Sequence, residues 1–162
     1  MLTLTCRKQW LGAMLCVTLL CGLARPSMAV LDKTRFVAHL GVAYFCFHHW
    51  VSNPYREGKF VTGAPHRTAS IVKAGAALLF AVHELKVSNK IAHESKDPTL
   101  QKVSGALDNM TNSFTSIGQK FKAGKFSSTD MDSLNGAFSQ VDSSARASKI
   151  DVKDRPVTLP GS

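Results

Sequence analysis

Seven apolar residues between positions 100 and 121 recur at alternating spacings of three and four. This heptad spacing places them on one side of an α-helix, whereas a half-buried β-strand would alternate every second residue. The positions between them hold mainly Ser, Thr, Asn, Gln and Lys, so the helix is predicted to pack through one stripe and to expose its other faces. The seven residues are Leu100, Val103, Leu107, Met110, Phe114, Ile117 and Phe121.

Three further segments have helical spacing, and residues that stop or start helices separate them. We predict these helices over about 32–52, 68–94 and 128–150, and Asp32, Asp97 and the run from Ser127 to Asp130 offer N-terminal caps. In the helix over 68–94, Val72, Ala76 and Leu79 extend the core face. Asn53-Pro54 ends the first, Asp97-Pro98 restarts the chain after the second, and Gly124 ends the heptad helix. Short links after the second and third helices predict an all-α fold, an antiparallel up-down-up-down four-helix bundle with a long loop between helices 1 and 2.

The first 29 residues have the order of a secretory signal peptide. Arg7 and Lys8 precede an apolar stretch from Trp10 to Leu23, and Pro26 to Ala29 follows with a turn and small side chains. The apolar stretch is shorter than the roughly 20 residues that a membrane-spanning helix needs. We therefore predict export to the periplasm or the medium with cleavage after Ala29; an uncleaved membrane anchor is the alternative.

The chain divides into three predicted parts. Residues 1–29 are the cleavable signal peptide, residues 30–150 form the four-helix bundle, and residues 151–162 are a flexible C-terminal tail, because the tail has two Pro and few apolar residues. The bundle segment has the length of one domain with a single core.

The charge balance is basic. The chain has 20 Lys and Arg against 11 Asp and Glu, and loss of Arg7, Lys8 and Arg25 with the signal leaves 17 against 11. The excess is spread along the chain, which is typical of a solvated helical surface rather than a nucleic-acid track. We expect no nucleic-acid partner. Outside the cytoplasm, we expect the basic residues to face an anionic envelope surface.

One of the four cysteines remains after the predicted cleavage. Cys46 lies between Phe45 and Phe47, so we expect a buried thiol; an intermolecular link is the alternative. A single cysteine cannot form an intrachain disulfide. The chain has no Cys-x-x-Cys-His motif, which excludes covalently attached haem.

The long connection from Asn53 to Arg67 mixes aromatic and cationic side chains. Long connections inside a small domain are uncommon unless they bind something or are mobile. We predict a partner-binding surface here, and the alternative is a strap that packs over the end of the bundle through its aromatic residues. The predicted contact residues are Trp50, Tyr55, Arg56, Lys59, Phe60 and Arg67.

Counting residues from the turns places three side chains that can bind haem iron in one layer of the predicted bundle. His39 falls opposite about position 81, within one turn of His83, and His83 falls opposite about Met110. Paired His, or His with Met, are axial ligands of b-type haem, and such cofactors lie between facing helices. The alternative is that His39 and His83 are polar core residues that fix the register. No metal site is predicted, because neighbouring His48 and His49 point about 100° apart on a helix.

Sequence signatures of catalysis are otherwise missing. The chain has no nucleophile elbow and no phosphate-binding Gly loop, and carboxylates are few in the predicted helices. We therefore expect a non-catalytic exported protein that binds a protein partner, a second copy of itself or an envelope component. Two alternatives are a non-covalent haem or metal carrier built on His39 and His83, and an immunity or inhibitor protein.

Overall fold

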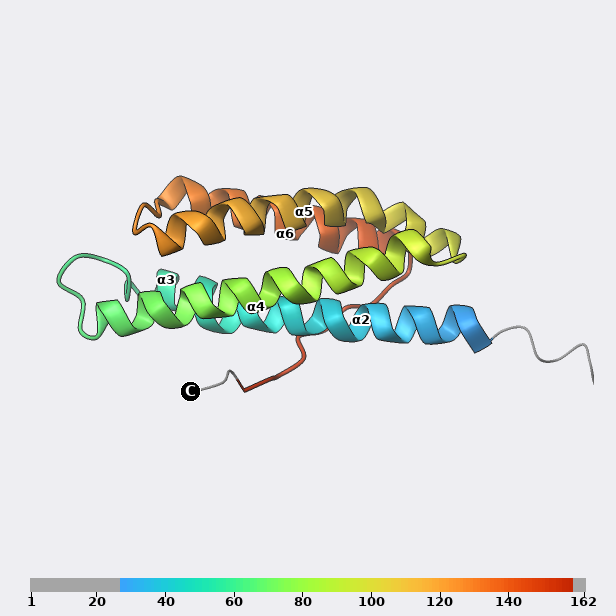
Figure 1. Cartoon of the computed structure of the whole chain (residues 1–162), viewed down its shortest axis with the longest axis horizontal. Coiled ribbons are helices and arrows are strands. Elements are labelled where there is room, and N and C mark those ends of the chain that lie inside the picture. Colours follow the sequence, from blue (N-terminus) through green and yellow to red (C-terminus); the bar gives the residue numbers. More distant parts are fainter. Residues whose placement is uncertain (1–26, 159–162) are drawn as a thin grey trace, which may run out of the picture.

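The computed structural model describes residues 27–158, and every regular element in that range is a helix (Figure 1). The elements are α2 (Ser27–Phe47), the π-helical turn η1 (His48–Ser52), α3 (Asn53–Arg56), α4 (Arg67–Glu94), α5 (Pro98–Lys122) and α6 (Ser128–Ala147). The prediction of an all-α fold with four long helices is confirmed.

Each long helix packs against the next one along the chain, α2 on α4, α4 on α5 and α5 on α6. Figure 1 shows α2 and α4 in one layer and α5 and α6 in the other. Ser95, just after α4, donates from Oγ to Asp32 near the start of α2 at 3.2 Å. Further along, Nδ1 of His39 lies 2.6 Å from Oε2 of Glu84. These two pairs show that α2 and α4 run in opposite directions.

The core lies between the two layers and contains the whole heptad stripe of α5. All seven predicted stripe residues are buried. Phe47 of α2 packs on Phe114 of α5, with ring centroids 5.3 Å apart, and on Phe138 of α6 at 5.8 Å. The heptad pattern therefore predicted the packing face of α5 correctly.

The ends of α5 and α6 follow the predicted capping chemistry. Asp97 accepts the Thr99 amide at 2.8 Å, and Pro98 occupies the first turn of α5, where its missing N–H leaves no bond unmade. Ser127 and Asp130 form a reciprocal capping box at the start of α6. Gly124 follows α5 with φ of +66°, a conformation that costs glycine little.

The first helix differs from its predicted bounds at both ends. It begins at Ser27, so Asp32 is not its N-terminal cap and instead accepts the hydroxyl of Ser95. At the other end Asn53-Pro54 does not stop the helical path, which continues through η1 and α3 to Arg56. A proline ring clashes with the carbonyl four residues before it in a regular α-helix, and the wider π turn relieves that clash. The non-helical connection is correspondingly shorter, residues 57–66.

Residues 151–158 lie along α2 rather than extending freely into solvent; that this C-terminal tail is flexible stays a prediction. The Arg155 amide donates to the Gly41 carbonyl at 2.9 Å, and Asp154 lies 2.8 Å from Nδ1 of His48. A side chain at Gly41 would overlap the carbonyl oxygen of Lys153. The close approach therefore depends on a glycine inside α2, a signal the sequence analysis did not use. Residues 159–162 lie outside the described residues.

The predicted signal peptide falls almost wholly outside the described residues, which begin at position 27. Ser27, Met28 and Ala29 form the start of α2. Cleavage after Ala29 stays a prediction.

Candidate functional site

The aromatic residues of the predicted binding loop pack inward. Phe60 is buried and meets Phe121 and Phe126, with centroids 6.0 and 6.3 Å away. Half-buried Tyr55 stands edge-on to Phe126 at 6.1 Å. This aromatic cluster closes one end of the fold. Tyr55 and Phe60 therefore pack over the end of the bundle. This is the arrangement given above as the alternative to a partner-binding surface.

The cations of the same loop have mixed surroundings. Nε of Arg67 donates to the Phe60 carbonyl at 2.9 Å, so this side chain fastens the loop. Lys59 lies 2.6 Å from Glu57 in an exposed ion pair. Arg56 is exposed. All three predicted contact residues with charge are thus exposed, and Arg67 alone is also bonded to the loop backbone.

Trp50 lies in η1 and is the centre of a surface aromatic group. The His49 ring packs on Trp50 at 4.8 Å and stacks on Phe45 at 5.0 Å. Nζ of Lys73 on α4 lies 5.8 Å from the centre of the Trp50 ring, within the range of a cation–π contact. The π turn positions this group, and π turns recur at functional sites in proteins.

Two open hollows flank His49 and Trp50. One, of about 290 Å³, is lined by Asn53, Pro54 and Lys73 among others. The other, of about 790 Å³, lies between Phe45, Phe80 and the C-terminal segment at Val157. The second is lined mainly by apolar side chains. His49 and Trp50 therefore form a ridge between a polar hollow and an apolar groove.

The neighbouring surface of α4 is also apolar. Val72 is 65% exposed and Leu79 is 46% exposed, with exposed Ala69 and Ala76 on the same face at heptad spacing. The sequence analysis assigned Val72, Ala76 and Leu79 to an extension of the core face; the structure corrects this. The packing face of α4 instead turns toward α2 and α5 through buried residues such as Ala77 and Ala81.

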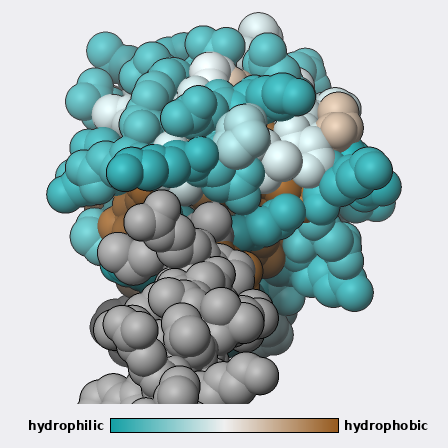
Figure 2. All heavy atoms as spheres, turned by 90° about the vertical axis from the view of Figure 1, so that its right-hand side faces the viewer, coloured by the Kyte–Doolittle hydropathy of each residue, from teal (hydrophilic) through white to brown (hydrophobic). Residues whose placement is uncertain are grey.

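We use the term outer face for this continuous surface on α2, η1 and α4. Its residues are Phe45, Trp50, Val72, Ala76, Leu79 and Phe80. Figure 2 views a different part, the end where α4 is linked to α5, and the surface there is mostly hydrophilic. The outer face lies instead on the last turn of α2, on η1 and on the first half of α4. Trp50 is its one residue that the sequence analysis proposed for partner binding.

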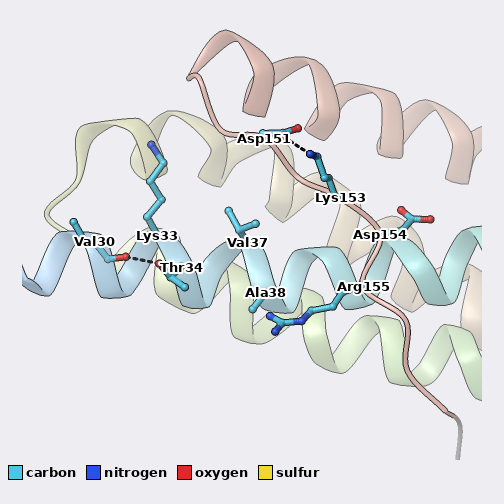
Figure 3. Close-up of a pocket in the computed structure, with 9 residues that line it drawn as sticks. All are labelled: Val30, Lys33, Thr34, Val37, Ala38, Asp151, Lys153, Asp154 and Arg155. Carbon is cyan, nitrogen blue, oxygen red and sulfur yellow. Dashed lines mark hydrogen bonds and ion pairs between the residues drawn. The ribbon is translucent and has the colours of Figure 1, made fainter.

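A third hollow lies beside the C-terminal segment (Figure 3). Its volume is about 520 Å³, and its lining includes Val30, Val37, Lys33 and Arg155. Both of its carboxylates have side-chain partners: Asp151 lies 3.3 Å from Nζ of Lys153, and Asp154 lies 2.8 Å from Nδ1 of His48. This hollow is formed by residues 151–155 packing on α2.

The three candidate haem ligands lie in different surroundings. His39 is half-buried and bonded to Glu84, His83 is exposed, and Met110 is fully buried. The contact of His39 with position 84 lies within one turn of the register expected from the sequence. Residues 27–158 contain no cluster of three His, Cys, Asp or Glu residues arranged to hold a metal ion.

The remaining histidines have partners outside any shared site. His48 bonds Asp154, and Nε2 of His93 lies 3.2 Å from Asp108. His66 is exposed in the loop, with φ of +56°.

Cys46 is buried, as its aromatic neighbours predicted. Burial, with a smaller contribution from the Glu84 carboxylate, raises the pKa of the thiol to about 11. Because the thiolate is the nucleophilic form, Cys46 is poorly suited to covalent chemistry.

No protein-family model matches this chain, and no curated protein and no solved structure matches it either.

Proposed function

We propose that this chain is an exported, non-catalytic binding protein that attaches to a protein partner or to a component of the cell envelope. The outer face is the observation that carries the proposal. Four large apolar or aromatic side chains on α4 and η1 contribute to it: Val72 and Leu79 are exposed, and Trp50 and Phe80 are half-buried and pack against the core. Contiguous apolar surface of this kind typically marks an interaction site.

Export fits the arrangement of the core. Every buried hydrophobic residue in the described range lies between Phe36 and Ile150, so cleavage after Ala29 leaves the described core complete. Val30 and Leu31, which would then follow the new terminus, are exposed. The processed chain is therefore expected to fold without residues 1–29.

The proposed architecture is the up-down-up-down bundle, with α2, α4, α5 and α6 each antiparallel to the next. The pairs Asp32–Ser95 and His39–Glu84 support this for α2 and α4. The short link from Glu94 to Pro98 supports it for α4 and α5. In this architecture α2 and α4 form one side of the bundle and present the outer face.

The experiment is production of the full chain in a bacterial host, followed by fractionation and mass spectrometry. The proposal predicts an extracytoplasmic product that begins at Val30 and is recovered in association with membranes or in a complex larger than a monomer. A precursor that stays in the cytoplasm would contradict export. An exported monomer that associates with nothing would contradict the binding function.

A further inference from the structure

We infer that the outer face docks on an anionic lipid membrane surface, with α4 lying parallel to that surface. This inference rests on the proposed function, because it names the envelope component that the exported protein binds. Its occupant is a phospholipid bilayer with anionic headgroups, not a second protein chain.

The first argument is the chemistry of the apolar residues. Val72, Ala76 and Leu79 lie on successive turns of α4, and Phe80 leads from them to Trp50 and Phe45. Tryptophan and phenylalanine with aliphatic neighbours are the side chains that interfacial helices insert at the boundary between headgroups and acyl chains. The outer face is therefore a surface that can enter a bilayer to the depth of its side chains.

The second argument is the distribution of charge. Residues 30–94, which include α2 and α4, carry eight Lys and Arg against four Asp and Glu, whereas residues 95–147 carry six against five. The basic excess is thus concentrated in the layer that bears the outer face. An anionic surface attracts such a layer and orients it toward the membrane.

The positions of individual charges agree with this distribution. Lys73 lies over Trp50, and Lys86 follows Leu79 by seven residues on the same face of α4; both are exposed. Asp32 and Glu84 are bonded to other side chains of the fold, whereas exposed Glu94 projects from the same face of α4 as Ala76, five turns further along. Asp32 accepts from Ser95, Glu84 bonds His39, and Glu94 lies 3.8 Å from Lys90 at the far end of α4.

The same charges argue against two other arrangements. A second copy docked face to face would bring the basic side chains of Lys73 and Lys86 of each chain near those of the other, which like-charge repulsion disfavours. A membrane-spanning arrangement is suggested by length and composition, because α4 alone among the described helices is long and apolar enough to cross a bilayer. Spanning would, however, strip α4 from α2 and α5 and carry the Glu84 carboxylate into hydrocarbon.

The experiment is co-sedimentation of the processed protein with vesicles of phosphatidylcholine alone and of equal parts phosphatidylcholine and phosphatidylglycerol. We expect at least about tenfold tighter binding to the anionic vesicles, weakened by added salt, since the attraction is partly electrostatic. After loss of Trp10 with the signal, Trp50 is the sole tryptophan, so a blue shift of its emission reports entry of the outer face.

Matched variants test whether vesicle binding depends on the outer face or only on the net positive charge of the protein. Leu79→Glu, and separately Lys73→Glu with Lys86→Glu, are each expected to weaken binding by about tenfold or more. The control is Lys102→Glu with Lys122→Glu, the same charge change on exposed positions of α5, which is expected to alter binding less than about twofold. Circular dichroism checks that each variant keeps its helices; all five positions are exposed.

Three results would overturn the inference. The first is equal binding to both vesicle types. The second is equal loss of binding in the α5 control. The third is a dimer that forms without lipid and is abolished by Leu79→Glu, because a second copy would then cover the outer face. If vesicles do not bind but the exported protein is recovered in a complex with another protein, the inference fails while the proposed function stands.

Discussion

Nδ1 of His39 lies 2.6 Å from Oε2 of Glu84, and this pair joins α2 to α4 within the layer that bears the outer face. The Glu84 side chain is 11% exposed, whereas that of His39 is 33% exposed. Removing one partner is therefore expected to have a different cost from removing the other. Loss of the histidine leaves a nearly buried carboxylate without its bond, whereas His39 without Glu84 can still reach water.

This asymmetry gives the first prediction. His39→Ala is expected to lower the free energy of unfolding by about 2 kcal/mol, and Glu84→Ala by less. The two effects should couple in a double-mutant cycle measured by denaturant unfolding. The exposed pair His93–Asp108 is the control: His93→Ala is expected to cost less than about 1 kcal/mol. Equal costs at His39 and His93 would contradict the argument.

A second prediction concerns Gly41. Alanine inside a helix normally stabilises a protein by about 0.5–1 kcal/mol relative to glycine, and Gly105→Ala in α5 is expected to do so because nothing lies near its added methyl group. Gly41→Ala should instead destabilise by about 1–3 kcal/mol, since the methyl group overlaps the Lys153 carbonyl. Faster hydrogen exchange of the Arg155 amide would show that residues 151–158 have come away from α2. A stabilising Gly41→Ala would refute their close packing.

A third prediction follows from Asp130. Hydrogen bonds from Lys120 and then from Ser127 hold the pKa of this carboxyl below its ordinary value. A carboxyl with a lowered pKa in the folded state contributes stability that is fully present above its unfolded pKa of about 4 and is lost as the pH falls through the folded value. The melting temperature of Asp130→Asn should therefore be below that of the wild type at pH 7. The difference should shrink as the pH falls below about 4; a constant difference would contradict the assignment.

A fourth prediction concerns Cys46. Because the thiol is buried and its pKa is raised to about 11, the folded processed protein should react with a thiol reagent at neutral pH far more slowly than the unfolded protein. The measurement is colour release from Ellman's reagent with and without denaturant. Rapid reaction in the folded state would show that the helix around Phe45 and Phe47 opens easily.

The sequence predicted the interior of the fold better than its surface. The heptad residues from Leu100 to Phe121 and the caps at Asp97 and Ser127 lie where local pattern and capping chemistry put them. Such features depend on residues close together in the chain, so a single sequence contains their signal. The path through Pro54 was mispredicted, because the π turn that accommodates the ring depends on how η1 packs against α4.

The candidate site was predicted only in part. Trp50 was named from the sequence, but Val72 and Leu79 were assigned to the core because helical spacing alone cannot tell which of two apolar faces is covered. The packing of Arg155 on Gly41 joins residues more than one hundred positions apart, and no local pattern specifies such a contact. To predict the exposed face of α4 or the contact of Arg155 with Gly41, one must know which segments lie side by side in the fold.

The most direct test of the account is site-specific photocrosslinking in cells that export the protein. A photoreactive residue replaces Leu79 on the outer face in one variant and Lys102 on α5 in the other; both positions are exposed. The account predicts adducts of phospholipid mass at position 79 and few or none at position 102. Equal labelling at the two positions, or none at position 79, would contradict it.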